Sequence, residues 1–170
     1  GLPLVVIGDG PERRRLEAMA GPTIRFLGSC GDAEANAWLE CCRAYVYAGL
    51  EDFGIAPVEA MAAGAPVIAY GAGGLRDSVR CLQEGDPHPT GLLFPQQSAA
   101  SLAAALEHFE SAALWRRLPP EGQRQWAENF APERFRERMA TVLERHWHRH
   151  GERLRREGAA IPTGASVPLG

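Results

Sequence analysis

Short β-rich runs alternate with helix-like stretches along the first two thirds of the chain, and this alternation constrains the fold more than any other feature. The expected strands cover residues 4–7, 24–27, 45–48, 67–70 and 92–94. The expected helices cover residues 12–20, 33–42, 56–63, 75–82 and 99–109. Strand, helix and strand in this order require a parallel sheet with helices on both faces. The sequence therefore predicts an α/β, Rossmann-like fold.

The β pattern stops after Phe109, and two further helices are expected at 121–130 and 132–150. Pro119 and Pro120 interrupt the chain before the first of them. We expect residues 1–150 to form one domain whose start is truncated, because the chain begins inside a strand pattern. Residues 151–170 are rich in Gly, Pro, Ala and Arg without an apolar period, which predicts a disordered tail.

Composition indicates an ordinary globular protein. The 170 residues are 45% hydrophobic, enough for a sizeable core. A net charge of −3 and a pI near 6.0 give no electrostatic reason to expect nucleic acid as a partner. No apolar run reaches the roughly 18 residues of a membrane-spanning helix, and no secretory signal is visible. We therefore expect a cytoplasmic protein.

Cysteine and histidine spacing predicts neither a disulfide scaffold nor a metal site. The four cysteines, Cys30, Cys41, Cys42 and Cys81, lack C-x-x-C spacing and are expected to be reduced and buried. His146 and His150 stand four residues apart on an expected helix, but no carboxylate or cysteine cluster accompanies them. We predict no metal at these positions.

The segment 51–67 places two carboxylates around a turn and a short helix. Pro57 suits the first turn of that helix, and Gly64 is its expected C-terminal stop. Free N–H groups and the positive end of the helix dipole suit a phosphate. Carboxylates beside an anion site are explained if Glu51 and Glu59 accept hydrogen bonds from hydroxyl groups on either side of the phosphates. A nucleotide-sugar offers such hydroxyls on its sugar and on its ribose.

The pattern E-x-F-G-x-x-x-x-E-A-M-A-x-G-x-P-V, from Glu51 to Val67, resembles the E-x7-E signature of the retaining GT-B glycosyltransferases of family 4. Four further stretches match that family in the same order, at residues 4–11, 24–28, 73–77 and 90–94. The E-D-F-G-I form of the motif further resembles the mannosyltransferase-like branch, which builds surface polysaccharides. The chain thus resembles the C-terminal, donor-binding half of a GT-B enzyme.

The resemblance assigns roles to the residues of the central motif. It implies that Glu51 is the catalytic-site residue that contacts the hydroxyls of the transferred sugar. Phe53 and Gly54 would supply backbone N–H groups to the sugar or the diphosphate, and Ile55 belongs to the same substrate-binding set. Glu59 would bind the ribose hydroxyls.

Glycine-rich loops complete the expected site. Ligands of open α/β sheets bind at the carboxyl ends of the strands, where Gly8, Gly28, Gly73 and Gly74 are expected to line a common rim. Gly8 lies in a Gly-Asp-Gly-Pro sequence that also forms ordinary turns. Gly73 and Gly74 could offer N–H groups to a phosphate or permit tight packing. Arg25, in the second strand, is expected at the surface.

The resemblance also implies what the reaction needs. Transfer would require no metal or other cofactor, and the donor would be a nucleotide diphosphate sugar such as GDP-mannose or a UDP-sugar. A sugar or lipid-linked acceptor would bind through an N-terminal domain that precedes these residues, and membrane association would involve that half alone. The family's basic Arg–Lys pair has no match here. We therefore expect weak donor binding and no turnover by this chain alone.

Other functions remain open from the residues. A split or truncated product could be a non-catalytic nucleotide-sugar-binding module. Two carboxylates across a sugar also suit a glycoside hydrolase, although that chemistry needs no phosphate-binding helix. A nucleotide-sugar epimerase is a further alternative. By resemblance the last helix would run toward the preceding domain, and Phe135, Met139, Val142 and Leu143 would form an exposed interface on it.

Overall fold

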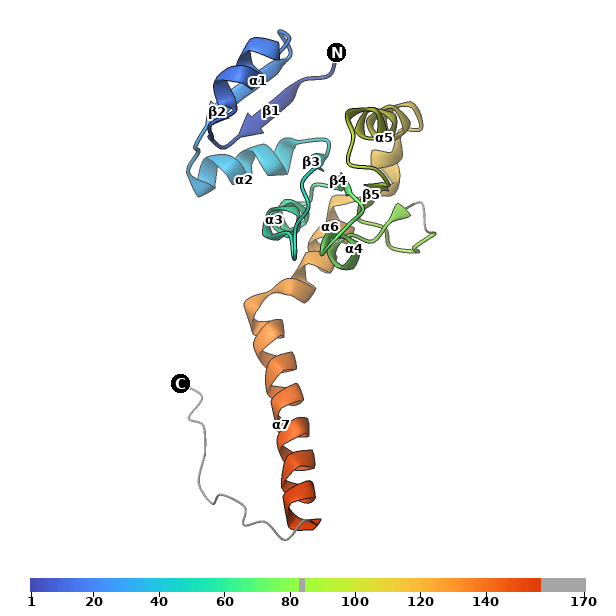
Figure 1. The fold of residues 1–170 in the computed structure, drawn as a ribbon. Helices are drawn as coiled ribbons and strands as arrows, with labels where there is room; N and C mark the ends of the chain where they lie inside the picture. The colour runs from blue at the N-terminus through green and yellow to red at the C-terminus, as the bar shows by residue number, and fades with distance from the viewer. Residues whose placement is uncertain (83–84, 157–170) are drawn as a thin grey trace. The chain divides into compact units, whose positions relative to one another are not determined.

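The computed structural model describes residues 1–82 and 85–156 and divides the chain into two compact units (Figure 1). The first unit is Gly1–Ala127, and the second begins at Glu128. All strands belong to the first unit and run parallel to their neighbours. The α/β class predicted from the sequence is confirmed.

The strands form two parallel sheets rather than one. One sheet pairs β1 (Leu4–Ile7) with β2 (Ile24–Gly28), and the other has the order β3 (Tyr45–Tyr47), β4 (Val67–Tyr70) and β5 (Gly91–Phe94). Each strand lies within one residue of its predicted bounds. The β1–β2 sheet is only partly covered, since the ends of β1 are exposed: Leu4 by 43% and Ile7 by 39%.

The helices of the first unit are α1 (Arg13–Met19), α2 (Asp32–Cys41), α3 (Ile55–Ala63), α4 (Leu75–Ser78), α5 (Ala99–Ser111), α6 (Pro120–Ala127) and the 3₁₀ helix η2 (Leu114–Arg117). Most match the predicted ranges, but α4 ends at Ser78 instead of residue 82. The cause is a competing backbone pairing: Cys81 bridges to Gly91, and the carbonyl of Arg80 accepts a hydrogen bond from Thr90 N–H. The 3₁₀ helix η2 was not predicted.

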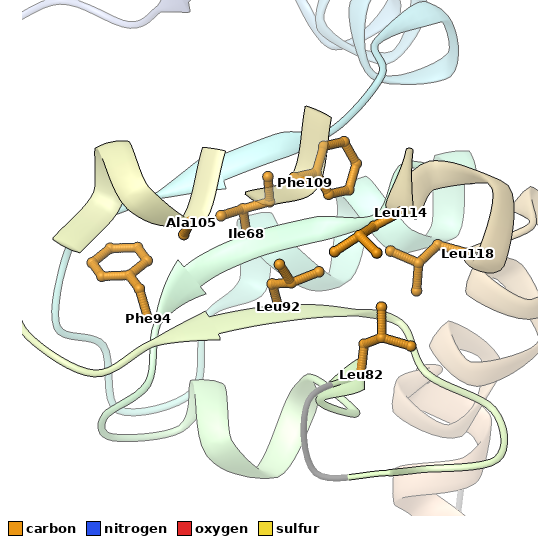
Figure 2. Packing of buried hydrophobic residues seen from close by; sticks show 8 residues of the cluster. All are labelled: Ile68, Leu82, Leu92, Phe94, Ala105, Phe109, Leu114 and Leu118. Atoms are coloured by element: carbon orange, nitrogen blue, oxygen red, sulfur yellow. The ribbon is translucent and has the colours of Figure 1, made fainter. Parts of the chain in front are cut away.

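Helices cover both faces of the β3–β4–β5 sheet because alternate residues of β4 point to opposite sides. On one face Ile68 packs with residues of α5 and η2, as Figure 2 shows for Phe109 and Leu114. On the other face Val67 and Ala69 pack with residues of α3, α4 and α6. The predicted layering is therefore present around this sheet.

The second unit consists of η3 (Glu128–Phe130) and the long helix α7 (Pro132–Arg156). The helix continues six residues past His150, where the sequence predicts a tail to begin. Residues 157–170 of the expected tail lie outside the described residues. The expected exposed residues of α7 are exposed: Phe135 by 60%, Met139 by 41%, Val142 by 45% and Leu143 by 61%.

Cysteine burial departs from expectation. All four thiols are free, as predicted, but only Cys81 is buried, and Cys41 is exposed. Cys41 is the last residue of α2, a helix with no buried residue, so its thiol stays exposed. Within residues 1–82 and 85–156, no helix combines the length and apolarity needed to cross a membrane.

Candidate functional site

Helix α3 has the termini that the sequence predicts. Gly54 precedes its first residue with φ 86°, and Gly64 follows its last with φ 103°, both in the left-handed region that favours glycine. Gly64 N–H donates to the carbonyls of Ala60 and Met61, which closes the C-terminus. Pro57 is buried in the first turn, where its missing N–H costs nothing.

Glu51 is held by a residue that sequence reasoning missed. The Tyr47 hydroxyl donates a short hydrogen bond to Glu51 Oε1, and this bond is the largest cause that raises the pKa of Tyr47 to about 12. Gly49 makes the arrangement possible, because a Cβ at this position would lie 2.7 Å from the Tyr47 hydroxyl oxygen. The carboxylate therefore has a defined orientation before any ligand arrives.

Tyr45 lies within the electrostatic influence of both carboxylates of the motif. Its ring stacks on Tyr47 with centroids 6.4 Å apart. Burial raises the pKa of Tyr45, and the charges of Glu59 and then Glu51 raise it further. Both carboxylates thus lie near enough to one phenol to act on it. Glu59 itself is exposed on α3.

The loop at Gly73 and Gly74 packs directly against the loop that carries Glu51. Gly74 N–H donates to the Glu51 carbonyl at 2.8 Å. A Cβ at Gly73, whose φ is 59°, would lie 2.3 Å from that carbonyl oxygen, and one at Gly74 would lie 2.2 Å from the carbonyl oxygen of Asp52. Tight packing therefore accounts for both glycines. A role for them in phosphate binding stays a prediction.

Gly8 and Gly28 meet at the carboxyl ends of β1 and β2. Gly8 N–H donates to the Gly28 carbonyl at 2.7 Å, and both residues have positive φ, 120° and 77°. Asp9 accepts hydrogen bonds from Gly10 N–H at 2.8 Å and from Arg13 at 3.2 Å. These contacts define the turn that the sequence predicts. A ligand role for the two glycines also stays a prediction.

Apolar side chains around the motif face solvent. Leu50 is 63%, Phe53 48% and Ile55 66% exposed. Three exposed apolar residues within six positions are unusual beside a buried sheet and suit a surface that receives a ligand or a second protein surface. Phe53 and Ile55 are accessible, whereas Gly54 between them is buried. The predicted substrate-binding roles of these three residues stay predictions.

Three positions of the site were missed by sequence reasoning: Tyr47, Gly49 and Gln97. Gln97 Nε2 donates to the Ala48 carbonyl at 3.0 Å and so ties the segment after β5 to the end of β3. The alternation of Tyr45 and Tyr47 just before Glu51 is the signal that could have found the first. Arg25 is exposed, with its guanidinium 5.6 Å from the centroid of the Trp38 ring. No three metal-ligating side chains meet within the described residues.

The fold and these loops define a Rossmann-like α/β domain with a motif of two carboxylates at the edge of its three-stranded sheet. The family "Glycosyl transferases group 1" matches residues 1–111. The chain belongs to this family, which confirms the resemblance drawn from the motif.

Individual relatives agree with the family match. A GDP-mannose-dependent alpha-mannosyltransferase of Mycobacterium tuberculosis is 41% identical over 93 residues, covering 54% of this chain and 23% of that protein. A phosphatidyl-myo-inositol mannosyltransferase of Mycobacterium leprae is 39% identical over 108 residues, 61% of this chain and 27% of that protein. The solved sucrose-phosphate synthase of Thermosynechococcus elongatus has a TM-score of 0.68 at 28% identity, over 85% of this chain and 38% of its own. The chain thus spans about a quarter of the length of these mannosyltransferases.

Proposed function

We propose that this chain is the donor-binding part of a retaining glycosyltransferase that transfers a hexose, from GDP-mannose or a UDP-sugar, in polysaccharide or glycolipid synthesis. The observation that carries the proposal is the pair of carboxylates Glu51 and Glu59 around the start of α3, with Glu51 oriented by Tyr47. The similarity to mannosyltransferases supports a mannosyl donor.

The chemistry follows from what the leaving diphosphate and the sugar need. Departure of the diphosphate leaves an oxocarbenium-like sugar, so both partners require groups that are already in position. The N-terminal end of α3 would face the diphosphate, because the N–H groups of its first turn have no partners within the helix. Glu51 would accept hydrogen bonds from the sugar hydroxyls and Glu59 from the ribose. No metal enters this scheme.

Calorimetry with GDP-mannose, GDP and pyrophosphate tests the two roles separately. Glu51→Gln should weaken GDP-mannose binding and leave GDP binding unchanged. Glu59→Ala should weaken GDP binding and leave pyrophosphate binding unchanged. Loss of a hydrogen bond to a charged group, about 1.5–3 kcal/mol, corresponds to about 10- to 150-fold in affinity.

Asp52→Asn is the matched control, since this exposed carboxylate is adjacent to Glu51 and stands at a variable position of the motif. Equal losses for Asp52→Asn and Glu51→Gln would contradict the proposed sugar contact. A preference for UDP-glucose over GDP-mannose would remove the mannosyl donor and keep the class of reaction. Transfer by residues 1–170 without any partner chain would contradict the expectation that a further domain is needed.

An assay for hydrolysis of aryl glycosides distinguishes the proposed glycosyltransferase from the alternative, a glycoside hydrolase. The proposal expects none, because the site would act on a bond to a diphosphate. Such hydrolysis, with no binding of GDP or UDP, would replace the proposed function.

A further inference from the structure

The loop that follows β5 lies beside the candidate site, although the sequence alone assigns it no role. Strands β3, β4 and β5 are parallel neighbours, so their carboxyl ends share one edge of the sheet. Three loops leave this edge, and we call them the first, second and third loops: residues 48–54, 71–74 and 95–98. Gly71 N–H donates to the Phe94 carbonyl at 2.9 Å, which joins the starts of the second and third loops. The third loop therefore leaves the same edge as the loop that carries Glu51.

The start of α5 fixes the backbone of the third loop. The Ser98 side chain caps the helix by accepting a hydrogen bond from Ser101 N–H at 3.2 Å. The Ser101 hydroxyl oxygen accepts a hydrogen bond from Gln96 N–H at 3.4 Å. Ser98 N–H also donates to the Gln96 carbonyl at 2.7 Å, and Gln97 is the central residue of this three-residue turn. The side chain of Gln97 thus starts from a well-held backbone.

Gln97 reaches from the third loop to the first loop. Its Nε2 donates to the Ala48 carbonyl at 3.0 Å. The pairing of β3 with β4 ends where Tyr47 lies opposite Ala69, so Ala48 is the first residue beyond the ladder. Gln97 therefore holds the main chain at the point where it leaves β3.

The peptide group between Ala48 and Gly49 connects this hydrogen bond to the carboxylate. Since a peptide group is planar, a fixed Ala48 carbonyl also fixes the direction in which the chain enters Gly49. Gly49 lies directly against the Tyr47 hydroxyl, because a Cβ on this glycine would be 2.7 Å from the hydroxyl oxygen. That hydroxyl donates to Glu51 Oε1. A change at Gln97 is therefore expected to reach Glu51 through Gly49 and Tyr47.

The main chain of the first loop is held at two points. Gln97 holds it at Ala48, and Gly74 N–H holds it at the Glu51 carbonyl at 2.8 Å. Leu50, between these points, is 63% exposed, so burial of its side chain contributes little to its position. Loss of the bond from Gln97 would leave the segment before Glu51 free to turn.

Satisfying an exposed carbonyl does not by itself require Gln97. Water bonds a carbonyl at the end of a strand nearly as well as a side chain does. The hydrogen bond from Gln97 is therefore expected to add little to the stability of the fold. Unlike water, a side chain on a fixed backbone also defines the direction of the bond, and this direction is what a preorganised site needs.

We propose that Gln97 is a positioning residue for Glu51, which holds the peptide after Ala48 so that the Tyr47 hydroxyl stays directed at the carboxylate. The third loop thereby contributes to recognition of the transferred sugar by acting through Glu51. This inference rests on the proposed function in one respect, since it takes Glu51 to be the residue that contacts the sugar.

Calorimetry with GDP-mannose and GDP tests the proposal in the full chain. Gln97→Met keeps the length of the side chain and removes the donor. It should lower affinity for GDP-mannose about two- to fivefold, the effect of one exposed neutral hydrogen bond, and leave affinity for GDP unchanged. Gln97→Lys keeps a donor at similar reach and should recover most of the loss. Gln96→Met is the matched control, because Gln96 is the exposed neighbour and no side-chain hydrogen bond holds it among the described residues.

A double-mutant cycle tests whether Gln97 acts through Tyr47. In the Tyr47→Phe background the bond to Glu51 is already absent, so adding Gln97→Met should cause no further loss of GDP-mannose affinity. Additive losses would overturn the proposed route. Equal losses for GDP and GDP-mannose, or equal losses for Gln96→Met and Gln97→Met, would overturn the positioning role.

A measurement without ligand separates this inference from the proposed function. The bond to Glu51 is the largest cause that raises the pKa of Tyr47 to about 12. In an NMR titration of the Tyr47 ring, Gln97→Met should therefore lower this pKa toward 10.0, whereas Gln96→Met should not. An unchanged pKa would overturn the inference. A lowered pKa in a protein that binds no GDP-mannose or UDP-sugar would support the positioning of Glu51 and count against the proposed function instead.

Discussion

Replacement of Tyr47 by Phe tests whether the orientation of Glu51 matters for the sugar. The variant keeps the ring that stacks on Tyr45 and removes only the hydroxyl that donates to Glu51 Oε1. Hydrogen bonds to charged groups contribute about 1.5–3 kcal/mol, and the exposure of this one lowers its contribution to about 1 kcal/mol. Affinity for GDP-mannose should therefore fall about fivefold, while affinity for GDP stays unchanged.

Calorimetry with both ligands measures this difference, and Tyr45→Phe is the control because it removes a phenol from the same strand without breaking the bond to Glu51. A loss of equal size for GDP and GDP-mannose, or no loss for either, would refute the role of Tyr47.

The pKa of Tyr47 adds a second readout. The Tyr47 pKa is raised from 10.0 to about 12, so the protonated form is favoured in the folded state. The stability that the raised pKa contributes is fully present below pH 10 and is lost as the pH rises toward 12. Between these pH values the free energy of unfolding should therefore fall more steeply for the wild type than for Tyr47→Phe.

Three further substitutions probe the packing of the site and the core. Gly49→Ala should displace the Tyr47 hydroxyl from Glu51, so its GDP-mannose affinity should match that of Tyr47→Phe, with little change in thermal stability. Gly73→Ala should destabilise the fold by more than the roughly 1–2 kcal/mol of a left-handed alanine, because its Cβ also meets the Glu51 carbonyl; denaturant melts measure this, and unchanged stability would contradict the packing. Gln123→Met should stabilise by about 1–3 kcal/mol, since Gln123 is fully buried and its amide has no partner among the described residues; a lower melting temperature would show that the amide is satisfied.

Local pattern was sufficient to predict most elements. Each strand is an apolar run between turn residues, so its position follows from short-range chemistry, as at Val67–Tyr70. Helix α4 was predicted too long because residues 80–81 have helical neighbours in sequence but pair with Thr90 and Gly91 in space. The division of the strands between two sheets depends on long-range pairing, which no local pattern specifies.

The candidate site likewise contains some residues that local sequence predicts and others that depend on long-range contacts. Gly54 and Gly64 were predictable because a left-handed backbone at a helix end requires glycine or a close substitute. Gln97 was not, because a loop glutamine has no required partner in sequence, and for Tyr47 the alternation with Tyr45 before Glu51 is only an indirect signal. The tight packing of Gly74 became visible only with its contacts, since its N–H donates to the Glu51 carbonyl within the protein.

The two carboxylates of the motif are prepared to different degrees, and this difference bears on their proposed roles. Glu51 is fixed through its side chain by Tyr47 and through its carbonyl by Gly74 N–H. Glu59 is exposed, and its side chain has no hydrogen bond or ion pair with residues 1–82 and 85–156. A group that must hold the reacting sugar in position gains most from preorganisation, whereas a group that anchors a ribose can order on binding at a cost of about 0.5–1.5 kcal/mol. This difference supports the proposed roles, with the fixed carboxylate, Glu51, at the transferred sugar and Glu59 at the nucleotide.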